Sequence, residues 1–351
     1  MHMADALLAP AVAAAMYVAS GTAAGVSVKK LKQDDEPQKL PTMAVTAAVV
    51  FAGQMINYTI PGTGSSGHMC GGMMLSALLG PYAGFLSMIV ILAIQCLFFA
   101  DGGLMALGAN IWNMAFYGCF VGYFLIWKPI MHSKWFGEGK SAIRKRIIAA
   151  SILGCVITLQ LGALSVVLET SLSGITELPF GAFVSLMQPI HLAIGLVEGL
   201  ITSAVLCFVF ESRPELLRDV NEAAGGMLEP KRSLKATVGI LAIVALVVGG
   251  GLSLLASGNP DGLEWALFGN ADGGYSTNMG LDEENFGVSS QAAETAESIQ
   301  EKTSFLPDYS FTGSDSPAGT TVSGLVGSAM VAGAALLICF AGGFFRKKKR
   351  A

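Results

Sequence analysis

The stretch MCGGMMLSALLGPYAGFLSMIVILAIQCLFF, residues 69–99, decides how this chain crosses a bilayer. Its 31 residues are too many for one comfortable membrane helix, which needs roughly 20, and too few for two full ones. Gly80 and Pro81 stand inside the stretch, where a helix would break. We therefore expect a short helix over 69–79 and a return helix over 81–99.

The composition of the whole chain is that of an integral membrane protein. Of its 351 residues, 53% are Ala, Val, Ile, Leu, Met, Phe, Trp, Tyr or Cys, and only 13% are charged. Soluble domains carry roughly 25% charged residues, so the lipid bilayer is the expected partner. The net charge is −4 and no basic stripe occurs, which argues against a nucleic-acid partner. The six cysteines form no CxxC pair and are typical of small core residues.

The charges between the apolar runs set the orientation. Twenty of the 21 Lys and Arg residues lie in the gaps 29–39, 128–146 and 211–235 and in the tail 346–350, which the positive-inside rule assigns to the cytoplasm. The apolar runs themselves lie at 6–28, 42–60, 69–99, 104–127, 147–168, 180–210, 235–256 and 322–345.

The gaps 29–39 and 128–146 are both cytoplasmic, so an even number of membrane passes must separate them. Three apolar runs lie between these gaps, so the run 69–99 has to turn back on itself. The sequence thus predicts an all-α integral membrane protein of about nine transmembrane helices, with the N-terminus outside and the C-terminus inside. A cleaved signal peptide is the alternative for the first helix. No basic residue precedes that helix, however, and Lys29, Lys30 and Lys32 follow it, so we expect it to be retained.

Residues 257–321 form the one large outside loop in this topology. The loop holds eleven Asp and Glu residues against a single lysine. Such a segment is either a solvated loop or a source of negative potential that concentrates cations over the outer face.

Only four histidines occur, and the topology brings two of them, His2 and His68, to the outer face. A histidine at position 2 can chelate a metal through the Met1 amine, its own amide nitrogen and its imidazole. One imidazole from elsewhere would complete a square of nitrogens, which suits Ni²⁺ or Cu²⁺. A histidine in that position also occurs without any metal role, so the pattern alone leaves both readings open.

Other polar residues within the apolar runs have two readings each. His191 and Glu198 are seven residues apart on one helix, where they could form a functional polar pair or join helices structurally. Asp101 opens an outer turn, with Asn110 and Asn113 on the helix that follows. They could orient a metal-bound imidazole by hydrogen bonding, or simply cap and pack helices. The sequence contains no nucleotide-binding loop.

Several motifs together resemble the CbiM/NikM family, the substrate-binding membrane components of energy-coupling factor (ECF) transporters for nickel and cobalt. The resemblance covers about residues 1–212 and rests on four segments in family order. A later segment resembles the PDGLE, or NikN/CbiN-like, component of the same transporters. The segments are MHMADALLAP at the N-terminus, Gly64–Gly72, Asp101–Met114, His191–Thr202 and, for PDGLE, Pro260–Glu264 with Leu306–Tyr309.

The resemblance implies a fusion of two domains, 1–225 with seven helices and 226–351 with two helices around the outside loop. It implies metal held by Met1, His2 and His68, with Ni²⁺ or Co²⁺ as transported substrate and no permanently bound cofactor. Further residues are candidates for hydrogen bonds that orient these ligands: Asp5, Ser66, Asp101, Asn110 and Asn113. The usual Asp-Gly of the family is Asp5-Ala6 here, which bears on the turn that delivers His2.

The expected function is therefore uptake of Ni²⁺ or Co²⁺ at a bacterial or archaeal inner (plasma) membrane. The chain itself is not expected to be an enzyme. By resemblance, its partners are a transmembrane coupling component of the CbiQ/NikQ type and two cytoplasmic ATPases of the CbiO/NikO type. The alternative is a proton-coupled secondary carrier that uses His191 and Glu198. Because an amine and imidazoles must lose protons to bind metal, we expect binding to fail below about pH 6.

Overall fold

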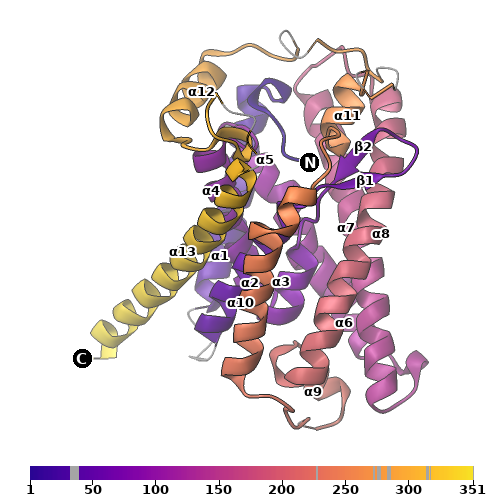
Figure 1. Ribbon diagram of the computed structural model, residues 1–351, viewed down its shortest axis with the longest axis vertical. Helices are drawn as coiled ribbons and strands as arrows, with labels where there is room; N and C mark the ends of the chain where they lie inside the picture. The colour runs from indigo at the N-terminus through magenta and orange to yellow at the C-terminus, as the bar shows by residue number, and fades with distance from the viewer. Residues whose placement is uncertain are drawn as a thin grey trace.

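The computed structural model of the protein describes residues 1–31, 39–226, 228–271, 273–274, 278–282, 286–313, 316 and 318–350. The fold is almost entirely helical, and its long helices run between two ends that carry the shorter elements (Figure 1). The beginning of the chain lies at one of these ends, close to two short strands and to helix α11 (Figure 1).

Nine helical segments of membrane type occur within the described residues. Six of them are long and apolar enough to span a bilayer, and α2 and α10 are shorter apolar helices. The predicted class and the approximate helix count are therefore confirmed. The segments are α1 (Pro10–Leu31), α2 (Lys39–Gln54), α3 (Gly72–Leu79), α4 (Pro81–Phe99), the continuous α5 (Leu107–Ile111), η2 (Trp112–Trp127) and α6 (Lys128–Met131), α7 (Lys140–Leu172), α8 (Phe180–Ser212), α10 (Leu234–Gly250) and α13 (Ala318–Arg350).

The predicted break between α3 and α4 is present. Gly80 has a φ of 83°, a conformation that favours glycine, and Pro81 is the first residue of α4. All residues of the short α3 are buried, which explains why every side chain on it is small or apolar. The returning pair α3–α4 therefore fills the interior of the bundle instead of facing lipid on all sides.

The two C-terminal helices belong to the same bundle as the rest. α10 and α13 pack on each other and on α2, whereas α7 and α8 pack along one another on the other side (Figure 1). On α8 the side chains of Leu192, Leu196 and Leu200 are exposed, as expected for a lipid-facing stripe.

The expected apolar run 42–60 is not one helix. It ends in the strand β1 (Tyr58–Ile60), which pairs antiparallel with β2 (Ser65–Gly67). Tyr, Thr and Ile favour strands, and Pro61-Gly62 turns the chain. The glycine-rich loop before His68 is thus the tip of a hairpin.

The long connection 257–321 carries helices of its own, α11 (Gly262–Phe268) and α12 (Gln291–Thr303), and the turn η6 (Pro307–Tyr309). α11 contacts α8 and β2, and α12 contacts α4 and the first turn of the chain, η1 (Asp5–Leu7). Parts of this acidic loop and of the basic gap 29–39 lie outside the described residues, as do the side chains of the tail 346–350. Four short elements complete the list: η3 (Lys134–Phe136), η4 (Pro214–Leu216), α9 (Val220–Ala223) and η5 (Leu252–Leu255).

The close contact between α3 and η2 generates a stability prediction. A β-carbon at Gly118 would lie 2.9 Å from the Cα of Gly72, against backbone that cannot move aside easily. Gly118→Val should therefore destabilise the protein by about 1–3 kcal/mol and lower the midpoint of thermal unfolding in detergent. Gly21→Val on α1 is the matched control, because nothing lies within 4 Å of its β-carbon position. Equal midpoints for the two variants would contradict this packing.

Candidate metal centre

The first residues of the chain run into the end of the bundle and are fixed there through the backbone of Met3. The Met3 N–H donates to Asn110 Oδ1 at 2.8 Å, and Asn110 Nδ2 donates back to the Met3 carbonyl at 3.2 Å. The Gly103 N–H donates to the same carbonyl at 2.9 Å. Since Met1 and Met3 are both buried, this arm is part of the core.

Asp5 fixes the turn that follows the arm. Its Oδ1 accepts a hydrogen bond from the Ala106 N–H at 2.8 Å, and a side chain at Gly103 would collide with it. The next residue is Ala6, and its carbonyl accepts a hydrogen bond from the Val288 N–H at 2.8 Å. The turn is thus formed with alanine at this position and is covered by the long acidic connection.

The arm brings His2 against His68, the residue that follows the hairpin. The two imidazole rings are stacked, with centroids 5.3 Å apart and an interplanar angle of 23°. His2 Nδ1 lies 3.0 Å from Asp101 Oδ1, and His2 Nε2 is buried with no hydrogen-bond partner among the described residues. His68 Nδ1 lies 3.2 Å from the Met69 carbonyl.

The Met1 amine completes this group of donors and contacts an acid that the sequence reasoning did not single out. The amine donates to Asp261 Oδ2 at 3.0 Å, and the same oxygen lies 3.9 Å from His68 Nε2. Asp261 belongs to the PDGLE segment and precedes α11, where Asp-x-x-Glu is a recognisable helix-capping pattern. That pattern predicts a cap and gives no sign of a contact with the first residue.

Asp101 is likewise bridged to the C-terminal part of the chain. Its Oδ2 accepts a hydrogen bond from the Tyr309 hydroxyl at 2.5 Å. Gln300 on α12 donates to the neighbouring Gly102 carbonyl at 2.8 Å and so fixes the turn that carries Asp101. Neither Tyr309 nor Gln300 was predicted from the sequence as a site residue.

Ser66 contacts the PDGLE segment instead of the histidines. Its N–H donates to the Pro260 carbonyl at 2.8 Å, and its hydroxyl donates to the Asn259 carbonyl at 2.8 Å. The strand β2 therefore docks on the residues that lead to Asp261.

The structure gives His191 and Glu198 separate partners, and no hydrogen bond joins the two among the described residues. His191 Nδ1 lies 2.8 Å from the Met187 carbonyl on its own helix. The carboxylate of Glu198 accepts from the N–H groups of Cys70 and Gly71 at 2.7 and 2.9 Å. These N–H groups precede α3, so Glu198 fixes the backbone directly after His68.

Asn113 lies deeper, below Met3. Its Nδ2 donates to Glu169 Oε2 at 2.8 Å and lies 3.5 Å from the Met3 sulfur. Glu169 is buried and was not singled out from the sequence, because it stands at the end of an apolar run. Of the five residues expected to orient ligands, Asp101 alone contacts a histidine. Asn110 and Asn113 contact Met3 of the arm, and Asp5 holds the turn after it. Ser66 holds the hairpin against the PDGLE segment.

Burial and charge set the protonation of the donors. Burial lowers the pKa of His2 to about 3 and that of His68 to about 4, so both rings are neutral at pH 7. Burial also disfavours the charged Met1 amine, but the Asp261 carboxylate outweighs this and raises the pKa of the amine. Burial would raise the pKa of Asp261, yet the amine and His68 hold it well below its usual range. Neutral imidazoles therefore face a charged amine–carboxylate pair.

An acidic cleft lies beside the His2 ring and the two carboxylates that contact the donors. It has a volume of about 950 Å³ and is lined by His2, by Asp101 and Asp261, and by further carboxylates on the long connection. Those further carboxylates are Glu264, Glu294, Glu297 and Asp308.

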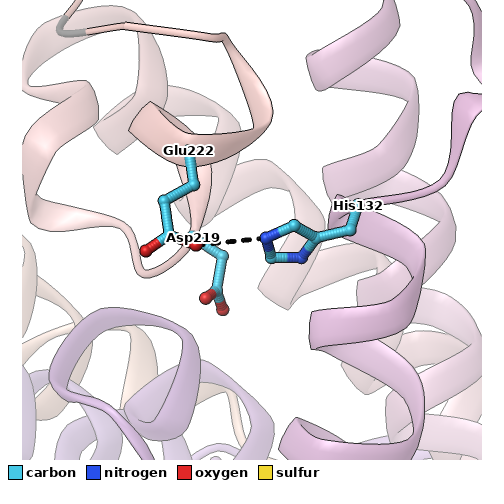
Figure 2. A group of neighbouring side chains, drawn as sticks. All are labelled: His132, Asp219 and Glu222. Atoms are coloured by element: carbon cyan, nitrogen blue, oxygen red, sulfur yellow. Dashed lines mark hydrogen bonds and ion pairs between the residues drawn. The ribbon is translucent and has the colours of Figure 1, made fainter.

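A group of neighbouring His, Asp and Glu side chains lies at the opposite end of the molecule, between α6 and α9. Figure 2 shows the His132 ring pointing toward Asp219 and Glu222, with His132 Nε2 3.2 Å from Glu222 Oε2. His132 Nδ1 contacts the Lys128 carbonyl, and Asp219 accepts from the Tyr123 hydroxyl at 2.9 Å. The Glu222 side chain is 75% exposed, so this is a hydrogen-bonded surface cluster. The Lys128 carbonyl and Glu222 raise the pKa of His132.

Two family models match consecutive parts of the chain. The family model for the cobalt uptake substrate-specific transmembrane region, CbiM, matches residues 2–216. A model of the PDGLE domain matches residues 235–342.

Two curated relatives extend over nearly the whole chain. A putative fused nickel transport protein NikMN of Archaeoglobus fulgidus is 34% identical, over 94% of this chain and 95% of its own length. The fused nickel transport protein NikMN of Rhodobacter capsulatus is 32% identical, with the same two shares covered. A crystal structure described as a truncated transition metal transporter superposes with a TM-score of 0.51 at 31% identity. It covers 60% of this chain and 99% of that one.

Proposed function

This chain belongs to the CbiM family of cobalt uptake transmembrane proteins and carries a PDGLE domain, and from that premise we propose that it takes up Ni²⁺ or Co²⁺ as the metal-binding component of an ECF transporter. It is a multi-pass membrane protein of nickel and cobalt transport, not an enzyme by this family membership. In the proposal, residues 1–225 bind the metal and residues 226–351 form the second domain.

The observation that carries the proposal is the convergence of amine and imidazole nitrogens from two distant parts of the sequence, residues 1–2 and residue 68. The Met1 amine and His68 Nε2 both lie near Asp261 Oδ2. The His68 ring in turn stacks on the His2 ring. Amine and neutral imidazole nitrogens suit late first-row divalent ions, and ligand type does not separate Ni²⁺ from Co²⁺.

The chelate proposed for residues 1 and 2 closes through His2 Nδ1, because only that ring nitrogen forms a six-membered ring with the His2 amide nitrogen. In the structure this atom contacts Asp101. Metal binding would therefore replace the hydrogen bond between His2 and Asp101 by a bond to the metal, while Tyr309 keeps its own hydrogen bond to the carboxylate.

We propose that the acidic cleft is the approach to this site from the outer face. Carboxylates from the long connection line it together with His2, and a cleft with charge of one sign raises the local concentration of counter-ions. The same orientation would place the basic gaps and the cluster at His132 on the cytoplasmic side.

Energy would come from other chains. We propose a transmembrane coupling component of the CbiQ/NikQ type and two ATPases of the CbiO/NikO type as partners. The rival proposal, a proton-coupled carrier using His191 and Glu198, is less favoured because these two side chains bond to backbone groups and not to each other.

The metal ligands can be tested on purified protein. One extra residue before Met1 should weaken Ni²⁺ binding by at least about a hundredfold, because it removes the terminal amine, and His68→Ala should do the same. His132→Ala is the matched control and should bind like the native chain, since His132 lies at the other end of the molecule. Competition with a chelator of known affinity measures all four proteins. Native affinity in the extended form would refute ligation by the amine.

The energy source is tested by uptake. Cells that express the chain together with its expected partners should accumulate radioactive nickel or cobalt, and a Walker-lysine substitution in the ATPases should reduce accumulation to background. A carrier driven by protons would instead accumulate metal without the ATPases and would stop when the proton gradient is dissipated. That result would overturn the ECF proposal.

The pH dependence of binding follows from the pKa shifts. With pKa values of about 3 and about 4, His2 and His68 hold no proton at neutral pH, so they do not oppose metal there. The amine, whose pKa is raised, must lose its proton to bind metal, and the His2 amide nitrogen of the proposed chelate must lose its own proton as well. Ni²⁺ affinity should thus rise by at least about tenfold per pH unit from pH 6 to pH 8. A titration that is flat above pH 7 and falls steeply between pH 7 and 6 would show that the imidazoles set the dependence instead.

A further inference from the structure

The Asp261 carboxylate has two oxygens with two different tasks. Oδ1 accepts from the N–H groups of Leu263 and Glu264 at 2.8 and 2.9 Å and so caps α11. Glu264 Oε2 accepts from the Asp261 N–H in return. With the side chain fixed from both directions, Oδ2 is left facing the Met1 amine. The capping box thus aims one oxygen at the first residue of the chain.

The segment that carries Asp261 is also bound to the loop that carries His68. Besides the hydrogen bonds from Ser66, Trp265 Nε1 donates to the Thr63 carbonyl at 2.9 Å. Asn270 Nδ2 donates to the Gly64 carbonyl at 2.8 Å. Gly262 packs so closely on α8 that a β-carbon there would lie 3.0 Å from Ile194. The segments that carry Asp261 and His68 are therefore joined by several hydrogen bonds of their own.

The arm has several hydrogen bonds at Met3 and beyond, but the Met1 amine has a hydrogen bond to Asp261 alone among the described residues. Without it, the bonds at Met3 would still hold residue 3, and the amine could turn away from His68.

We propose that Asp261 is a positioning residue that holds the Met1 amine in the metal site, so that the PDGLE domain directly sets how tightly the metal is bound. This rests on the proposed function. An amine bound to a metal through its lone pair keeps two N–H bonds, and one of them can still donate to Asp261. The contact is thus compatible with ligation, and it orients a ligand as outer carboxylates orient histidines at other metal sites.

Asp261→Asn tests the role without disturbing the helix. Asparagine caps helices as well as aspartate does, so α11 should persist. A single amide has one oxygen, however, and it cannot cap α11 and accept from the amine together. Ni²⁺ affinity should fall about tenfold or more. Asp261→Ser, which also caps but is too short to reach the amine, should show the same loss. Glu211→Gln is the matched control, because it also turns one carboxylate into an amide but Glu211 pairs with Lys231 at 2.8 Å in the gap predicted to be cytoplasmic, and its affinity should stay within about twofold of native.

A double-mutant cycle separates positioning of the amine from general damage. In a chain extended by one residue before Met1, the amine is no longer at the site, so Asp261→Asn should change the remaining Ni²⁺ affinity by less than about twofold. The spectrum of bound Ni²⁺ in Asp261→Asn with the native start should shift toward that of the extended chain. Equal losses in both backgrounds, or unchanged or tighter binding in Asp261→Asn and Asp261→Ser, would overturn the proposal.

The outcomes distinguish this inference from the proposed function. If the extension weakens binding and the Asp261 variants do not, the metal site stands and the role of Asp261 falls. If the extension itself has no effect, the amine is not a ligand, and the proposed function fails in its metal site.

Discussion

A charged amine inside the end of a helical bundle requires an opposite charge beside it, and much of this structure follows from that requirement. Water cannot solvate the Met1 ammonium in its buried position, so an unpaired charge there would be costly. Asp261 supplies the counter-charge from a segment far along the chain. The PDGLE segment that carries Asp261 also covers the arm, caps α11 and packs against the hairpin before His68.

Polar residues within the helices support this arrangement through backbone groups. Glu198 accepts from the two N–H groups in front of α3, where a helix start lacks acceptors and favours a negative charge. Asn110 holds both polar groups of the Met3 backbone. Buried polar side chains in this protein thus fix the course of the arm and of the chain after His68. The His2 and His68 rings are thereby stacked, with the Met1 amine beside Asp261.

The sequence was sufficient to predict the helices, because hydropathy, charge asymmetry and the break at Gly80 are local signals, and the same topology placed His2 and His68 at one face. The set of Met1, His2 and His68 as metal ligands came from the resemblance and stays a prediction. It was insufficient for the hairpin, since Tyr58, Thr59 and Ile60 continue an apolar run and only their pairing with residues 65–67 makes them a strand. The pair His191 and Glu198 shares a helix face as expected, but each takes a backbone partner that depends on neighbouring elements. Asp261 is the clearest case: its spacing to Glu264 reveals a helix cap, while the partner of its second oxygen is decided by how two distant segments dock.

The ion pair between the first residue and Asp261 spans 260 positions of the chain. A ribosome must therefore release nearly three quarters of the polypeptide before the ammonium of the first residue can meet its carboxylate. Until then the first residue lacks this counter-charge, although the bonds of Met3 to Asn110 and Gly103 can already form. This ion pair is therefore one of the last contacts of the arm that can form.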